Sequence, residues 1–193
     1  MDKTNYSKDT VKRYLEDLSA RRMVPGGGSV SALSAALGAA LNLMVINYSV
    51  KEGKTEATLT ELRSRQQTIL ETLESLIDED CRVFGQLMKV LSEKKDADKE
   101  YRDAAMVPLS VCNECIGSIA VTKNIIPYAN ADLNSDIGCA FYILKGAFYS
   151  AKLNVDINLK FIKDDVFVEG TKEDIIKKEN QLLDMEKDII GTI

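Results

Sequence analysis

The most constraining feature of this chain is the stretch from Met23 to Val50, which carries no charged residue. A stretch of that length raises the question of a transmembrane helix. It opens with Pro25 and three glycines, and serines and asparagines recur through it, so no continuous apolar span reaches bilayer length. We therefore interpret it as a helix buried on nearly all sides inside a helical protein, and we predict no association with a membrane.

Apolar side chains recur at the spacing of an α-helix along most of the remaining chain. They predict helices over residues 7–22, 55–92, 136–159 and 172–190, with another after Ser29 and another that ends near Pro127. No series of strands with period-two alternation is visible. The fold class that follows is an all-α bundle of about five to seven helices, formed by a single domain over residues 1–193.

Three segments interrupt this pattern. Pro108 predicts a kink or a helix start. The charged run over residues 92–100 predicts a solvated helix end or connection. Residues 164–168 are expected to form a short irregular or extended piece before the last helix.

Charge and composition limit the partners of the chain. Its 25 Lys and Arg residues against 30 Asp and Glu residues give a net charge of −5, which argues against nonspecific binding of nucleic acid. Two nearly uncharged helices are difficult to cover within one domain of this size, so we expect a homodimer. No apolar run follows a basic start after Met1, so we expect a cytoplasmic protein without a signal peptide.

The chain contains no histidine, which excludes Ser-His-Asp and Cys-His catalysis and His-ligated zinc. Acid–base chemistry must then fall to Asp, Glu, Lys, Tyr, Cys or water. Cys112 and Cys115 have the C-x-x-C spacing of a metal or redox motif, but no second pair accompanies them. Since positions i and i+3 share one face of a helix, we expect buried or half-buried, reduced thiols and no metal site.

The run Pro25-Gly26-Gly27-Gly28-Ser29 is the most unusual local feature. Three glycines immediately before a helix suggest that something approaches the backbone closely, and N–H groups at a helix start suit a carboxylate or a phosphate. No Lys-Ser/Thr follows at the spacing of a P-loop. We expect Ser29 to cap the helix. The alternative is a sterically demanding turn at which neighbouring helices cross.

Residues 25–41, PGGGSVSALSAALGAAL, resemble the opening signature of the cyclodeaminase/cyclohydrolase family of folate enzymes. Residues 135–140, SDIGCA, and residues 153–159, LNVDINL, resemble two further family segments in order and spacing, and Asp80 with Phe84 matches a D-x-x-x-F position. The family includes the cyclodeaminase half of formiminotransferase-cyclodeaminase and bacterial methenyltetrahydrofolate cyclohydrolases. One departure is the segment before Val107-Pro108-Leu109, which is usually longer and rich in alanine, whereas here it is the charged run.

The resemblance implies a helical homodimer that acts on a tetrahydrofolate one-carbon derivative without a metal or redox cofactor. A cyclohydrolase hydrates the methenyl carbon to give formyltetrahydrofolate, whereas a cyclodeaminase closes a formimino group and expels ammonia. Because no formiminotransferase domain is visible in this sequence, we expect the cyclohydrolase first. The sequence does not decide between the two enzymes, and the cyclodeaminase is kept as the alternative. A noncatalytic helical dimer that binds folate or serves in assembly is the alternative of another class.

The resemblance also assigns candidate site residues. A carboxylate beside the methenyl cation can stabilise it and deprotonate water, and the first candidate is Asp136, with Ser135 and Asn134 as hydrogen-bonding neighbours. Ser135 and Asp136 could instead only cap the following helix. Asp80 either lines the site or is a solvated acid. Asn154 and Asn158 are expected either to bind the pterin or to form hydrogen bonds with other helices. The turn from Pro25 to Ser29 is expected to contact the substrate. Arg21, Arg22 or Lys145 is expected to bind the glutamate tail.

Overall fold

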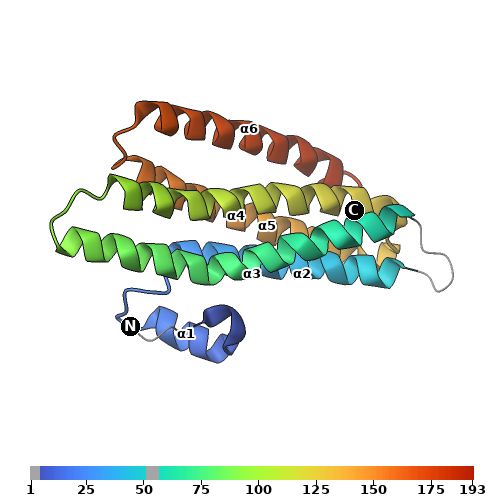
Figure 1. The fold of residues 1–193 in the computed structure, drawn as a ribbon. Helices are drawn as coiled ribbons and strands as arrows, with labels where there is room; N and C mark the ends of the chain where they lie inside the picture. The colour runs from blue at the N-terminus through green and yellow to red at the C-terminus, as the bar shows by residue number, and fades with distance from the viewer. Residues whose placement is uncertain (1–4, 51–56) are drawn as a thin grey trace.

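The structure, a computed structural model, describes residues 5–50 and 57–193. Within these ranges the chain forms six α-helices and three short 3-10 helices, and no strand (Figure 1). The α-helices are α1 (Val11–Ser19), α2 (Gly27–Ser49), α3 (Ala57–Ser92), α4 (Asp98–Ile125), α5 (Asn134–Leu159) and α6 (Asp165–Ile190). The 3-10 helices are η1 (Tyr6–Lys8), η2 (Ile126–Tyr128) and η3 (Ala131–Leu133). The expected all-α fold is confirmed, with a number of helices inside the predicted range.

Helices α2 to α5 run alternately up and down and form one bundle, while α6 lies along α4 and α5 on one side (Figure 1). Helix α1 lies on the opposite side of the bundle from α6 (Figure 1), and its buried Tyr14 contacts the start of α2. Because the helices alternate in direction, the start of α2 lies at the same end of the bundle as the end of α5 (Figure 1). We call this the glycine-turn end. The start of α5 lies at the opposite end.

The uncharged stretch forms a helix of the core, but it is not buried on nearly all sides as predicted, since one face that includes Leu37 and Tyr48 is exposed. Its small residues let α5 come close: a methyl group at Gly38 would lie 2.7 Å from Cγ of Leu144. Helix α2 and the segment Asp98–Tyr128 are each long and apolar enough to span a membrane, but 56% and 61% of these spans are buried within the bundle. Such burial is what the packing of a helical core requires.

A buried polar cluster joins α2, α3 and α4 and explains the polar residues inside the uncharged helix. The Asn42 amide donates to Oγ of Ser118 at 3.0 Å and to Oγ1 of Thr122 at 2.8 Å. The Gln66 amide donates to the carbonyl oxygen of Ala39 at 2.9 Å and to Oγ of Ser118 at 2.9 Å. A buried polar group that lacked such a partner would cost roughly 1–3 kcal/mol, so the cluster fixes the register of three helices.

The structure corrects three predicted helix starts. The N-cap of α2 is Gly26, without a side-chain cap bond, so Ser29 lies inside the first turn rather than capping it. Helix α5 begins at Asn134, two residues earlier than predicted. Helix α6 begins at Asp165, and the segment expected to be irregular or extended is its first turn. The cause is Asp164, whose carboxylate accepts a hydrogen bond from the Phe167 N–H at 3.0 Å and caps the helix.

Three other expectations have simpler outcomes. The charged run does connect two helices, since α3 ends at Ser92 and α4 begins at Asp98. Pro108 starts no helix and lies inside α4. The first predicted helix is shorter than expected and covers only Val11–Ser19.

Candidate active site

The carboxyl group of Asp80 lies against the glycine turn at the start of α2. Its Oδ2 accepts a hydrogen bond from the backbone N–H of Ser29 at 2.9 Å. A methyl group at Gly28 would lie 1.9 Å from Oδ1 of Asp80, so only glycine leaves room for the carboxyl group in this position. The predicted close approach to the turn is therefore confirmed, and the group that approaches is a carboxyl of the same chain.

Burial gives Asp80 an unusual protonation equilibrium. Desolvation raises the pKa of its carboxyl from 3.8 to about 6, and the hydrogen bond from Ser29 opposes part of that rise. A desolvated carboxyl favours its neutral form, whereas a hydrogen bond donated to it favours the anion. With a pKa near 6, Asp80 can accept a proton at neutral pH and return it, as a general acid–base catalyst must.

Behind Asp80 lies a set of side chains that the sequence did not single out. The hydroxyl of Tyr14, which is buried, shares a hydrogen bond of 3.0 Å with Oγ of Ser29. Burial raises the pKa of Tyr14 to about 12 and that of Cys81 to about 11, so both groups keep their protons at neutral pH. Neither can compete with Asp80 as a base. In the sequence, Tyr14 belongs to an amphipathic pattern that is typical of core packing. That pattern did not indicate that its hydroxyl would bond Ser29 beside Asp80.

Helix α1 is fixed beside the turn by buried charge. The Asp17 carboxylate, only 3% exposed, accepts from Arg13 at 3.1 Å and pairs with Arg22 at 3.1 Å. The hydroxyl of Tyr6 donates to the same carboxylate at 3.2 Å. Arg22, expected as a receiver of a glutamate tail, is thus engaged within its own chain.

Part of the α5 candidate set lies close to the turn. A methyl group at Gly27 would lie 3.4 Å from Oδ1 of Asn154. The Ser31 hydroxyl donates to the Gly27 carbonyl oxygen at 2.7 Å and shares a hydrogen bond of 2.7 Å with the hydroxyl of Ser150. The Asn158 amide donates to the carbonyl oxygen of Ala104 at 3.1 Å and so links α5 to α4. This agrees with the alternative that Asn158 forms a hydrogen bond with another helix. Pro25 is buried and Gly26 is the N-cap of α2. The structure therefore brings together Asp80, the glycine turn and Asn154.

Asn134, Ser135 and Asp136 lie elsewhere in the same chain. They form the first turn of α5, at the end of the bundle opposite the glycine turn (Figure 1). Asp136 precedes Asn154 by 18 positions, which at 1.5 Å per residue is about 27 Å along the helix. The cap interpretation is wrong, because the N-cap is Leu133 and makes no side-chain cap bond. The assignment of these three residues to the site stays a prediction.

Other candidates have structural partners. Lys145, expected as a receiver of the glutamate tail, is engaged within its own chain, because its Nζ pairs with Glu186 at 2.6 Å and links α5 to α6. Cys112 and Cys115 are buried free thiols, as predicted. Phe84 follows Asp80 by one turn of α3 and is partly exposed.

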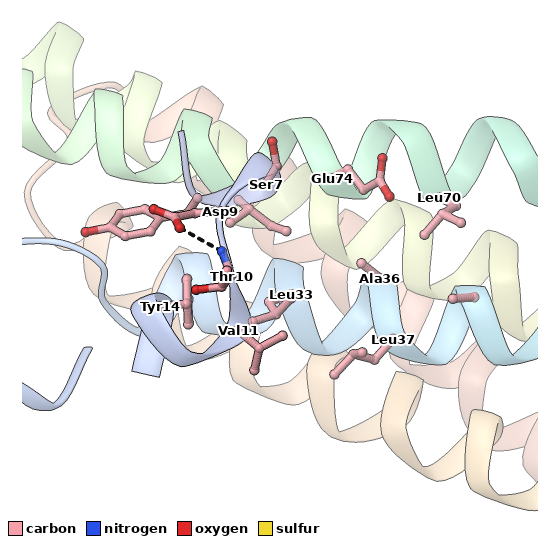
Figure 2. Close-up of a pocket in the computed structure, with 13 residues that line it drawn as sticks. Ser7, Asp9, Thr10, Val11, Tyr14, Leu33, Ala36, Leu37, Leu70 and Glu74 are labelled. Atoms are coloured by element: carbon pink, nitrogen blue, oxygen red, sulfur yellow. Dashed lines mark hydrogen bonds between the residues drawn. The ribbon is translucent and has the colours of Figure 1, made fainter. Parts of the chain in front are cut away.

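A cavity of about 230 Å³ adjoins this region between the N-terminal segment, α2 and α3 (Figure 2). Figure 2 shows Leu33, Ala36 and Leu37 of α2 facing Val11 of α1 across it. Its lining also includes Tyr14, the residue that contacts Ser29. None of the residues predicted for the site lines this cavity.

Most of the chain is similar to proteins of one family. The family model described as formiminotransferase-cyclodeaminase matches residues 10–177. A methenyltetrahydrofolate cyclohydrolase of Methylorubrum extorquens is 30% identical over 83% of this chain and 84% of its own length. The formimidoyltransferase-cyclodeaminase of Rattus norvegicus is 30% identical over 86% of this chain, which matches 33% of that longer protein.

A solved structure supports the fold independently. The formiminotetrahydrofolate cyclodeaminase of Thermotoga maritima superposes with a TM-score of 0.91 and 23% identity, over 97% of this chain and 96% of that chain. The chain therefore belongs to the formiminotransferase-cyclodeaminase family, a family of enzymes of folate one-carbon metabolism.

Proposed function

We propose that this chain is a methenyltetrahydrofolate cyclohydrolase, which adds water to methenyltetrahydrofolate and releases formyltetrahydrofolate. The observation that carries the proposal is the Asp80 carboxyl, held on the glycine turn with a pKa of about 6. Such a group matches a reaction that needs a base in its first step and an acid in its second. The substrate needs no metal or further cofactor for this chemistry.

The reaction begins from a delocalised cation, which the Asp80 carboxylate stabilises from close range. As the oxygen of water bonds to the methenyl carbon, Asp80 takes one of the water protons. The bond from that carbon to one ring nitrogen then breaks, and Asp80 returns the proton to the leaving nitrogen. The hydroxyl proton leaves to solvent as the formyl carbonyl forms, so one proton is released overall. The Ser29 N–H holds the carboxylate in position through both steps.

The similarity to the Methylorubrum extorquens cyclohydrolase supports this choice, because it extends over most of both chains. Formiminotetrahydrofolate cyclodeaminase is the alternative, supported by the likeness to the Rattus norvegicus and Thermotoga maritima proteins. In that reaction the same carboxyl would protonate the departing ammonia. Both reactions use Asp80 to transfer a proton to the leaving group, so only a direct assay can decide between them.

The assay follows the absorbance of the methenyl compound. Loss of methenyltetrahydrofolate that is faster with the protein than in buffer alone would establish the cyclohydrolase. Appearance of the methenyl chromophore from formiminotetrahydrofolate would establish the cyclodeaminase. If the protein changed neither rate, the proposal of an enzyme would be wrong, and the noncatalytic helical dimer would take its place.

We also propose that the protein acts as a homodimer. The bundle leaves large apolar side chains in solvent on neighbouring core helices, among them Leu37 and Tyr48 of α2, which are 58% and 75% exposed. Burying such surface between two copies is a common way to satisfy it. Sedimentation at micromolar concentration should give twice the chain mass, and a monomer would contradict the proposal.

A further inference from the structure

Ser29 is the first residue after three successive glycines that has a side chain. Glycine leaves a backbone free to adopt several conformations, and it offers no side chain through which neighbouring elements can restrict it. The hydroxyl of Ser29 is therefore the first side-chain group at the start of α2 that another element can hold. Ser29 is also fully buried, so this hydroxyl needs a partner within the protein.

Two groups of Ser29 bond two different helices. Its backbone N–H donates to Oδ2 of Asp80 on α3 at 2.9 Å, and its hydroxyl shares a hydrogen bond of 3.0 Å with the hydroxyl of Tyr14 on α1. The N–H and the side chain are attached to the same α-carbon, so a held hydroxyl restricts the direction of the N–H. A hydrogen bond weakens steeply when its donor points away from the acceptor.

Tyr14 is suited to hold a neighbour in place. Its side chain is 3% exposed, and burial raises its pKa to about 12, so its hydroxyl stays neutral. The ring of Tyr6 packs edge-on against its ring, with the two centroids 5.4 Å apart and the planes at 84°. The bond to Ser29 satisfies two buried hydroxyls at once, and breaking it would leave both without that partner.

The segment that carries Tyr14 is tied to the helix that carries Asp80. The backbone N–H groups of Tyr6 and Ser7 donate to the carboxylate of Asp78 at 2.6 Å and 3.2 Å. Asp78 lies two positions before Asp80 on α3. A helix of nine residues such as α1 is marginal by itself, so tertiary contacts of this kind determine where it lies.

We propose that Tyr14 is a positioning residue for Asp80, whose hydroxyl holds Ser29 so that the Ser29 N–H points at the Asp80 carboxylate. Tyr14 acts through Ser29 and touches no reacting atom. The inference rests on the proposed function, in which the same carboxylate must stay in place while it takes a proton and returns it.

Tyr14→Phe tests the role in turnover, because it removes the hydroxyl and keeps the ring. We expect kcat to fall about 10-fold with KM unchanged, since the carboxylate is misplaced while the contacts with substrate remain. Tyr6→Phe is the matched control, and it should keep the kcat of the parent. It also removes a buried hydroxyl, but the Asp17 carboxylate that this hydroxyl bonds keeps Arg13 and Arg22. Equal kcat in the two variants would overturn the proposal.

The protonation of Asp80 gives a second readout, which a role in packing alone would not change. The hydrogen bond from Ser29 favours the anion, so loosening it in Tyr14→Phe should raise the pKa of Asp80 above its value of about 6. The titratable groups beside Asp80 are Tyr14 of α1 and Cys81 of α3, and both keep their protons at neutral pH.

Carbon-13 NMR of the aspartate carboxyl carbons measures this pKa without substrate. The signal of Asp80 is identified by its loss in Asp80→Asn. Tyr6→Phe should titrate like the parent at this signal. An unchanged or lower pKa of Asp80 in Tyr14→Phe would overturn the proposal.

A double variant tests whether Tyr14 acts through Ser29. Ser29→Ala removes the hydroxyl and keeps the N–H that bonds Asp80. Because Tyr14→Phe and Ser29→Ala break the same hydrogen bond, the double variant should lose no more turnover than the more impaired single variant. Losses that multiply would show that Tyr14 acts by another route, against the proposal. Circular dichroism checks that each variant is folded.

The outcomes separate this inference from the proposed function. If the parent protein acts on neither substrate, the proposed function fails, and the NMR titration still decides whether Tyr14 positions Asp80. If the parent is active and Tyr14→Phe keeps both its kcat and its pKa at Asp80, the inference fails while the proposed function stands.

Discussion

Asp80 and Gly28 show how one residue determines the chemistry of another. The carboxyl reaches the Ser29 N–H only because position 28 has no side chain, and its burial there raises its pKa to about 6. The sequence indicated that something approaches the glycine turn, but it could not say what, because the partner lies 51 positions away on another helix. For the same reason only the structure could show that Asp80 is a half-buried acid bonded to the turn rather than a solvated one. Its place in the active site stays a prediction.

Gly28→Ala should expel the Asp80 carboxyl from the turn. The clash involves the flexible end of a side chain, so the midpoint temperature of unfolding should change little while turnover falls by about 100-fold through loss of general catalysis. Gly85→Ala is the matched control, since this position lies on the same helix as Asp80 and a methyl group there meets nothing within 4 Å. Equal turnover in the two variants would show that the docking of Asp80 is not needed.

Asp80→Asn should stabilise the fold at neutral pH. The folded-state pKa of Asp80 lies above its usual value, so the folded chain loses stability as the pH rises from about 4 to about 6. A shift of this size corresponds to about 2–3 kcal/mol. Urea unfolding should therefore show Asp80→Asn to be more stable than the parent at pH 7 and similar to it near pH 4. A constant difference across that range would contradict the raised pKa.

At the scale of helices, periodicity predicted which segments are helical, and single side chains decided where they begin. The α6 start was missed because residues 164–168 look irregular or extended by composition, whereas Asp164 in fact caps a helix. Asp164 also pairs with Arg102 of α4 at 3.1 Å. The α2 start was missed for the opposite reason, since Ser29 looks like a cap but bonds Tyr14 instead. The cap at Asp164 is a local signal, three residues from its donor. The bond of Ser29, in contrast, depends on a tertiary partner that the local sequence does not contain.

Asp164→Ala should destabilise the start of α6. Loss of an N-cap costs about 1 kcal/mol in the free energy of unfolding, and the exposed ion pair with Arg102 adds little. Asp165→Ala is the matched control, because Asp165 is the next residue and is exposed. Chemical denaturation that showed no difference between the two variants would contradict the cap.

At the scale of the whole molecule, the sequence predicted an all-α bundle and its core helix correctly. It also grouped Asp136 with Asp80 in one site, yet a single chain places them at opposite ends of the bundle (Figure 1). Linear order cannot reveal this separation, because α5 runs antiparallel to α2 and carries candidates at both of its ends.

The central claim is that Asp80 is the acid–base group of the reaction. The most direct measurement is the pH dependence of kcat/KM for methenyltetrahydrofolate, corrected for the spontaneous rate, in the parent protein and in Asp80→Asn. The parent should gain activity through an apparent pKa of about 6 and level off above it, because the base must be deprotonated in the free enzyme. Asp80→Asn should lose at least about 100-fold and lack that transition. A variant that turns over at the parent rate, with the same transition, would contradict the account.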